Sequence, residues 1–222
     1  MKRTFRNWMR GTCRMVFLCA GLAQPVHGVT LLHSFTGGAS DGDRPQGSLV
    51  NSGSTLYGMT SFGGSSNAGV VFSVNANGSG LSVLHSFESI PDGNGPFGSL
   101  VLSGSTLYGM TCYGGDSGLG TVFSIGTNGT GYSRLHFFSG PLDGARPYGT
   151  PVLSGSTLYG MTSAGGASNL GSVFKMETSG AGFALLHSFA GGVSDGASPF
   201  GSLTMVGSTL YGLTYDGGTS NL

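Results

Sequence analysis

Short apolar segments alternate with Gly-, Ser- and Asn-rich segments along most of the chain. Residues 99–138 contain four such apolar segments, SLVLSG, STLYGMT, GTVFSI and YSRLHFF, and their β-branched and aromatic residues are typical of strands. In TLYGMT, Tyr57 and Met59 would point to one face of a strand and Leu56 to the other. The pattern therefore predicts short strands that are apolar on both faces, as in sheets covered on both sides.

The strand pattern recurs at a nearly constant interval. GSTLYGMT begins at Gly53, Gly104 and Gly155, and GSTLYGLT begins at Gly207, which gives offsets of 51, 51 and 52 residues. A Leu-His pair with a following Phe recurs in step, at His33, His85, His136 and His187. Four strands in about 50 residues are typical of a β-propeller blade. A right-handed β-helix is the alternative, but its repeats are usually far shorter.

We therefore expect an all-β protein, a β-propeller built from four-stranded blades of about 51 residues. The propeller repeat domain would span 29–222, with a strand at 29–37, blades at about 45–89, 96–138 and 147–190, and a partial blade at 199–222. Because the partial blade holds only two strand segments, the sequence predicts an incomplete ring, truncated in the fourth blade. Its unpaired apolar edge would be prone to association.

The first 28 residues differ from the rest. They carry five basic residues and no acid in the first fourteen positions, then the apolar run 15–23 and the segment AQPVHG. This pattern predicts a signal peptide over 1–28 with cleavage after Gly28, and so a secreted or cell-surface protein. Cleavage after Ala23 and a basic leader on a cytoplasmic protein are the alternatives. The apolar run is too short for a transmembrane helix.

Composition excludes several classes of protein. Glycine accounts for 44 of 222 residues and charged residues for 8%, which excludes coiled coils and charge-driven disorder. After the leader, four cations face nine acids, so we expect no nucleic-acid partner. Cys112 is then the single cysteine, so no internal disulfide and no thiolate metal site is expected. No motif indicates a cofactor or a metal.

The combination of GTVFSI, a hairpin of the NGTG kind, RLHFF, DGxxP and GSTLYGMT resembles the GloVer family of choice-of-anchor tandem repeats, the Gloeo_Verruco repeat. The resemblance covers nearly all of the chain after the leader. It implies a secreted, surface-attached bacterial repeat protein in a family with no established biochemical activity. The strand pattern is also similar to NHL and kelch propellers, although not all of their signature residues are present.

Two long loops of each unit should emerge on one face of a propeller. One carries Asp-Gly with Pro four residues later, followed by an aromatic residue in three units; the other carries a double glycine. Carboxylates and aromatic rings there could bind an extracellular glycan or protein. The candidate binding residues are Asp41, Asp92, Asp143, Asp195, Phe97, Tyr148 and Phe200. The alternative is structural, because Asp before Gly commonly stabilises a turn.

The sequence thus favours a structural or binding module. The alternative is an extracellular carbohydrate-active enzyme, a lyase or hydrolase, that uses acids of the loop face. An enzyme should carry polar residues that break the repeat, and only Arg44, Arg146, Asp116 and Glu177 hint at this. The histidines recur identically in every unit, which favours a role between blades over that of a general base.

Overall fold

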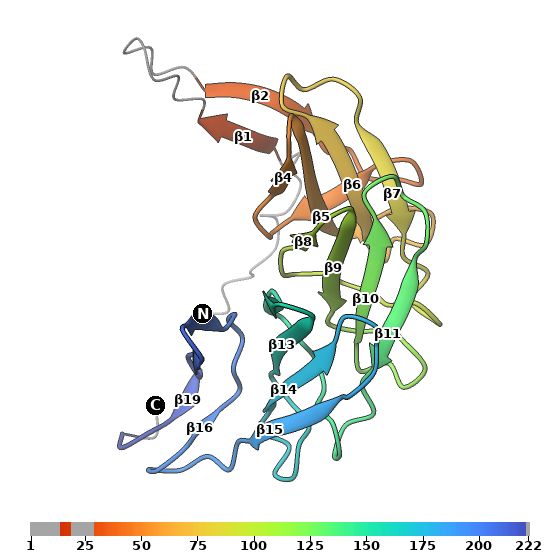
Figure 1. Ribbon diagram of the computed structural model, residues 1–222. Coiled ribbons are helices and arrows are strands. Elements are labelled where there is room, and N and C mark those ends of the chain that lie inside the picture. Colours follow the sequence, from red (N-terminus) through yellow and green to blue (C-terminus); the bar gives the residue numbers. More distant parts are fainter. Residues whose placement is uncertain (1–13, 19–28, 221–222) are drawn as a thin grey trace, which may run out of the picture.

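The computed structural model describes residues 14–18 and 29–220. Figure 1 shows these residues as a crescent of antiparallel sheets that follow one another along an arc. This part of the chain contains strands and turns but no helix, and therefore no helix that could cross a membrane. The all-β class predicted from the sequence is confirmed.

Three units form complete four-stranded blades. In each blade the strands pair antiparallel in sequence order, as short Ser-Gly and Asn-Gly connections require. The first blade contains β4 (Val50–Ser52), β5 (Thr55–Gly63), β6 (Val70–Asn75) and β7 (Ser82–Ser86). The second contains β8 (Val101–Ser103), β9 (Thr106–Thr111), β10 (Thr121–Gly126) and β11 (Ser133–Phe137). The third contains β12 (Val152–Ser154), β13 (Thr157–Thr162), β14 (Ser172–Glu177) and β15 (Ala184–Ser188).

Each end of the crescent carries a pair of strands. β17 (Thr204–Val206) pairs with β18 (Thr209–Tyr211) as the first two strands of a fourth unit. At the other end β1 (Arg14–Leu18) pairs with β2 (Val29–Ser34), and Met15 faces His33 just as Val71 faces His85 in the first blade. β1–β2 thus have the register of a third and a fourth strand. β1 lies inside the predicted signal peptide, whose residues 1–13 and 19–28 are outside the described part.

The Asp-Gly loop that precedes each blade pairs with the double-glycine loop of that blade. β3 (Gly42–Pro45) pairs with β5, and β16 (Gly196–Ala197) pairs with β19 (Asp216–Gly217). In the second and third units single bridges take their place, Asn94 to Tyr113 and Ala145 to Ala164. The Asp-Gly loop therefore lies beside the double-glycine loop of the blade that follows it. Both loops are on one face, here called the loop face, as the propeller arrangement predicts.

Aromatic side chains fill the space between neighbouring sheets. In three places a Phe that follows a fourth strand packs edge-to-face on the Phe of the next unit's third strand. The ring-centroid distances are 5.1 Å for Phe35–Phe72, 5.2 Å for Phe87–Phe123 and 5.3 Å for Phe138–Phe174. All six rings are almost completely buried. Each sheet is thus covered by its neighbour, which is why its strands are apolar on both faces.

Successive units also touch through glycine, near their first strands. A Cβ atom on Gly98 would lie 2.2 Å from the carbonyl oxygen of Gly149, and one on Gly47 would lie 2.2 Å from that of Gly98. Next to these contacts the backbone N–H of Ser48 donates to the Ser99 Oγ at 2.7 Å. Only glycine allows this approach of backbone to backbone.

A glycine in the middle of a strand is expected to let the next sheet approach closely, but the glycine in the middle of each second strand has a different reason. A Cβ atom on Gly58 would lie 2.7 Å from the ring of Phe72, its cross-strand partner in the same sheet. Gly160 has the same relation to Phe174, and only a more distant contact, at 3.3 Å, comes from Met110 of the neighbouring blade. These glycines make room mainly for an aromatic ring of their own sheet.

Candidate functional site

Each histidine of the repeat is hydrogen-bonded to the aspartate of the following loop. The Nε2 atom lies 3.1 Å from a carboxylate oxygen in His33–Asp41, 2.6 Å in His85–Asp92 and 3.1 Å in His136–Asp143. The first three aspartates are buried and the fourth, Asp195, is partly exposed. The same pair therefore recurs at the outer strand of every unit.

Backbone N–H groups occupy the same carboxylates. Asp143 accepts from the backbone N–H groups of Ser139 and Gly140, both at 2.9 Å. At Asp41, burial acts to raise the pKa, but hydrogen bonds from Thr36, Gly42 and His33 outweigh it and hold the pKa below its ordinary value. These aspartates close the loop as turn-stabilising acceptors.

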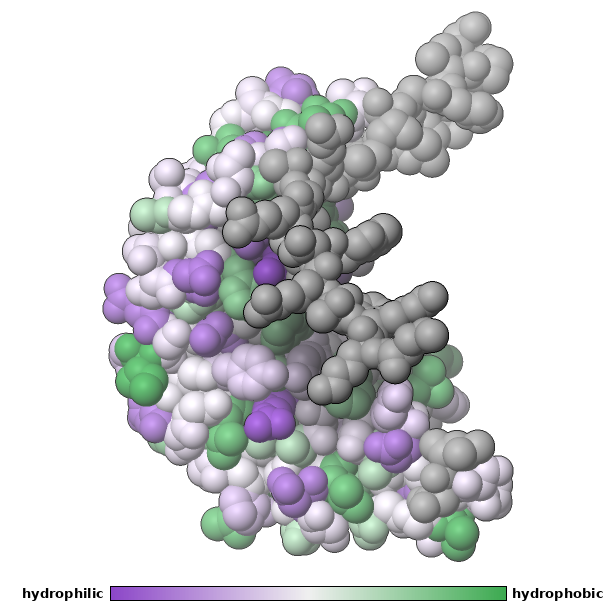
Figure 2. All heavy atoms as spheres, turned by 180° about the vertical axis from the view of Figure 1, so that it is seen from behind, coloured by the Kyte–Doolittle hydropathy of each residue, from purple (hydrophilic) through white to green (hydrophobic). Residues whose placement is uncertain are grey.

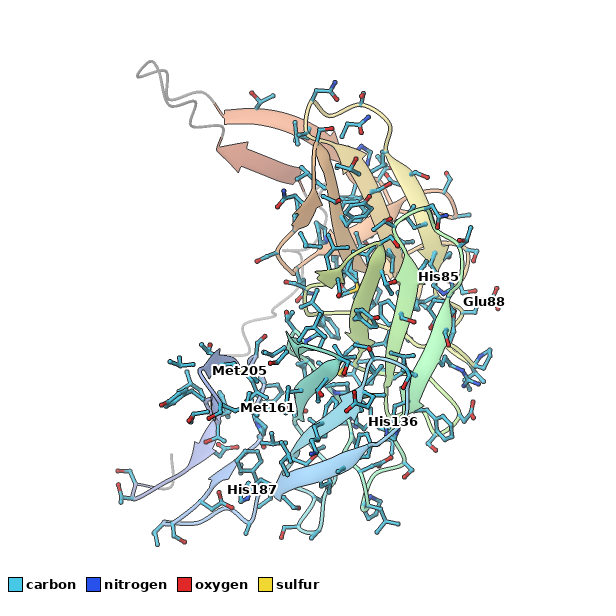
Figure 3. The ribbon with its side chains drawn as sticks, in the orientation of Figure 1. His85, Glu88, His136, Met161, His187 and Met205 are labelled. Carbon is cyan, nitrogen blue, oxygen red and sulfur yellow. The ribbon has the colours of Figure 1, made fainter. Side chains whose placement is uncertain are left out.

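The histidine rings lie between blades. His85 stacks on Tyr132 of the next blade, with a centroid distance of 3.9 Å and an interplanar angle of 6°, and His136 stacks on Phe183 with the same values. Burial lowers the pKa of His136 against the opposing effect of Asp143. His85, His136 and His187 occupy successive fourth strands (Figure 3). The predicted position between blades is confirmed for His85 and His136.

A second group of side chains forms a continuous set of rings on the loop face. Tyr148 stacks on Phe97 at 5.3 Å and packs edge-to-face on Phe200 at 5.0 Å. Its hydroxyl is 2.9 Å from the hydroxyl of Tyr113, and Phe200 in turn packs on Tyr215 at 5.7 Å. We call these five residues, which come from three successive units, the aromatic row.

The aromatic row is accessible at one end and supported at the other. Tyr215 is 73% exposed and Phe200 is 47% exposed, whereas burial raises the pKa of the Tyr148 hydroxyl. The guanidinium of Arg146 lies 5.9 Å from the ring centre of Tyr113. The row thus combines flat apolar rings, hydroxyl groups and one nearby cation.

Cys112 is completely buried, and this burial raises its pKa to about 11. In two other units a serine takes its place, and the hydroxyls of Ser61 and Ser163 donate to the carbonyl oxygens of Arg44 and Arg146. A thiol with so high a pKa is almost entirely protonated at neutral pH, which makes it a poor nucleophile. Cys112 is therefore a variant of a structural position.

The structure brings together three of the seven candidate residues, Phe97, Tyr148 and Phe200. The four aspartates stay apart, each paired with the histidine of its own unit. Whether any of these residues binds a ligand stays a prediction. Within the described residues no group of three His, Cys, Asp or Glu side chains could hold a metal ion.

Sequence reasoning missed the pairing of His with Asp. The signal was available, because the two residues are separated by seven or eight positions in all four units. No single position carries this signal, because it lies in the separation between two residues. Of the residues that break the repeat, Asp116 pairs with Arg134 at 2.7 Å, and Glu177 accepts from Ser156 at 2.9 Å.

Two solved structures are similar to this chain. A chain of the crystal structure of a nidogen/laminin complex is similar over 85% of this chain, with a TM-score of 0.54 and 15% identity. A putative TolB from Agrobacterium tumefaciens is similar over 77%, with a TM-score of 0.47 and 14% identity. This chain spans 60% of the first protein and 55% of the second.

The first likeness supports the propeller fold alone, because the identity is low. A comparison with curated proteins found no match. The Gloeobacter/Verrucomicrobia repeat, in contrast, matches residues 22–222, which include every strand described above except β1. The chain therefore belongs to the Gloeobacter/Verrucomicrobia repeat family.

Proposed function

We propose that this propeller-type repeat protein is a secreted or cell-surface module that binds an extracellular glycan through its aromatic row. The repeat architecture supports a binding or structural module. The basic and apolar pattern of residues 1–28 supports export. The ligand class rests on the row itself.

The observation that carries the proposal is the contact of rings from successive blades on one face. The apolar faces of sugar rings pack on aromatic rings, and tyrosine adds a polar group that can hydrogen-bond to sugar hydroxyls. Phe200 and Tyr215 offer exposed rings, while Tyr113 and Tyr148 supply adjacent hydroxyl groups. The row runs across blades, so it suits an extended chain of sugars better than a single one.

A glycan array probed with the full chain tests the proposal. We expect selective binding that Tyr148→Ala and Phe200→Ala weaken about ten-fold, because each ring contributes roughly 1.5 kcal/mol or more of contact. Phe137→Ala is the matched control, since Phe137 is 44% exposed but lies on β11, outside the row. Absence of binding to every glycan, or equal loss in the control, would contradict the proposal.

A further inference from the structure

Two arginines of the loop face have a backbone conformation that is unusual for a residue with a side chain. Arg44 and Arg146 have φ values of 57° and 58°, in the left-handed region that glycine adopts at a lower cost. Both stand directly before the proline of the Asp-Gly loop, and in the second unit Gly95, with a φ of 65°, takes this place. A strained residue where glycine would fit indicates a use for its side chain.

Hydrogen bonds on both sides hold the backbone of Arg146 in place. Its N–H donates to the carbonyl oxygen of Leu119 in the preceding unit at 2.8 Å. Its own carbonyl oxygen accepts from the backbone N–H of Ser163 at 3.1 Å and from the hydroxyl of Ser163 at 3.0 Å. The proline that follows, Pro147, restricts this backbone further. The direction in which the Arg146 side chain leaves the loop is therefore fixed.

Each of the two arginines lies over an aromatic ring of a double-glycine loop. The guanidinium carbon of Arg44 is 4.6 Å from the ring centre of Phe62 in its own unit. In the third unit Ala164 takes the place of Phe62, and the guanidinium of Arg146 lies over Tyr113 of the preceding unit, at 5.9 Å. Arg146 thus crosses from its own unit to the ring of another.

This position is next to the aromatic row. Tyr113 packs on Phe97 and on Tyr148, with distances between ring centres of 6.3 Å and 6.5 Å. All three rings are partly exposed, and Arg146 is exposed. A molecule that stacks on these rings therefore lies close to a guanidinium group.

The charge of Arg146 is not neutralised by a neighbouring acid. Within the described residues its guanidinium has no carboxylate at ion-pair distance, whereas Arg134 donates to Asp116 at 2.7 Å. Asp143, the acid nearest to Arg146 in the sequence, accepts instead from His136 and from backbone N–H groups of its own loop. Arg146 can therefore pair with an anion from outside the fold.

We propose that the aromatic row binds an acidic glycan and that Arg146 pairs with the carboxylate or sulfate groups of its sugars. This inference rests on the proposed glycan binding and adds the charge of the ligand to it. A guanidinium binds such anions through two parallel N–H···O hydrogen bonds, while the neighbouring rings pack on the faces of the sugars. A neutral glycan would leave Arg146 without a partner.

Two matched pairs of hexasaccharides test the charge of the ligand. One pair is hexagalacturonate and its methyl ester, and the other is a sulfated galactan hexasaccharide and its desulfated form. Their binding to the full chain is measured by isothermal titration calorimetry at low ionic strength. We expect the charged member of at least one pair to bind about ten-fold tighter than its neutral counterpart. High salt should reduce this difference, because it screens an exposed charge pair.

Variants of the chain assign the preference to Arg146. Arg146→Gly should remove it and leave the fold intact, since the second unit has Gly95 at this position. Arg146→Lys should keep part of it, because an ammonium group retains the charge but not the paired donors. Lys175→Gln is the matched control, since it removes one positive charge from an exposed side chain on β14, outside the aromatic row.

Equal affinity for the charged and neutral members of both pairs would overturn the inference, and so would a preference that Arg146→Gly leaves unchanged. In both cases, weaker binding by Tyr148→Ala shows that the proposed glycan binding itself is correct. No binding of either charged hexasaccharide overturns the inference as well. The proposed glycan binding then fails with it, unless the glycan array yields a neutral ligand.

Discussion

At the scale of single residues, the His-Asp pair both fixes a loop and contacts the next blade. Asp143 fixes the loop by accepting hydrogen bonds from His136 and from two backbone N–H groups, while the His136 ring stacks on Phe183 of the next blade. A histidine of this kind is a link between blades. The carboxylate that pairs with each histidine already accepts hydrogen bonds within the fold. These aspartates are the loop-face acids on which the enzyme alternative depends.

The lowered pKa of His136 predicts a pH-dependent stability. Because burial disfavours the charged ring in the folded state, the stabilisation is complete above the unfolded pKa of about 6.5 and is lost as the pH falls from there through the lower pKa of the folded state. The lowered pKa of Asp41 acts in a separate window, below its ordinary value of 3.8. We therefore expect thermal unfolding between pH 7.5 and pH 5 to report mainly on histidine.

Differential scanning fluorimetry across this range tests the prediction. His136→Gln should reduce the fall in melting temperature, because glutamine acquires no charge. The matched control is His187→Gln, whose side chain is half exposed. An unchanged pH dependence in His136→Gln would show that another group is responsible.

At the scale of elements, the strands were predictable, but the close contacts between blades were not. The four segments of residues 99–138 correspond to β8, β9, β10 and β11, because alternation and β-branched residues report local structure. The pairing of the two long loops followed from the propeller arrangement. The contact of Gly98 with Gly149 was missed, because a Gly-rich sequence does not show which of its glycines contact another blade.

Replacing a glycine between blades by alanine should lower the stability of the fold by an amount that depends on the position. Gly98→Ala should destabilise the chain by about 2 kcal/mol, because its Cβ would clash with the fixed backbone of Gly149. Gly201→Ala is the matched control at the same repeat position, where a Cβ would meet nothing within 4 Å. We expect it to leave stability unchanged or slightly raised. Equal effects in urea unfolding would refute this role.

At the scale of the whole molecule, the units form an arc whose sheets pack on one another. Figure 2 shows hydrophobic residues interspersed with polar ones over the described part of one face. The interval of about 51 residues predicted this architecture, because a unit that is apolar on both faces needs a neighbour on each side. The aromatic row could not be predicted from the repeat interval, because its contacts depend on the angle between blades.

The central claim is that successive units lie side by side, and disulfide cross-linking of Ser48→Cys with Ser99→Cys tests it most directly. The backbone N–H of Ser48 donates to Ser99 at 2.7 Å. The background carries Cys13→Ser and Cys19→Ser, and the buried Cys112 does not interfere. We predict rapid cross-linking of this pair under mild oxidation, measured by mass spectrometry, and none within one chain for Ser48→Cys with Thr150→Cys, which lie two units apart. Failure of the first pair, or equal cross-linking of both, would contradict the arrangement of the blades.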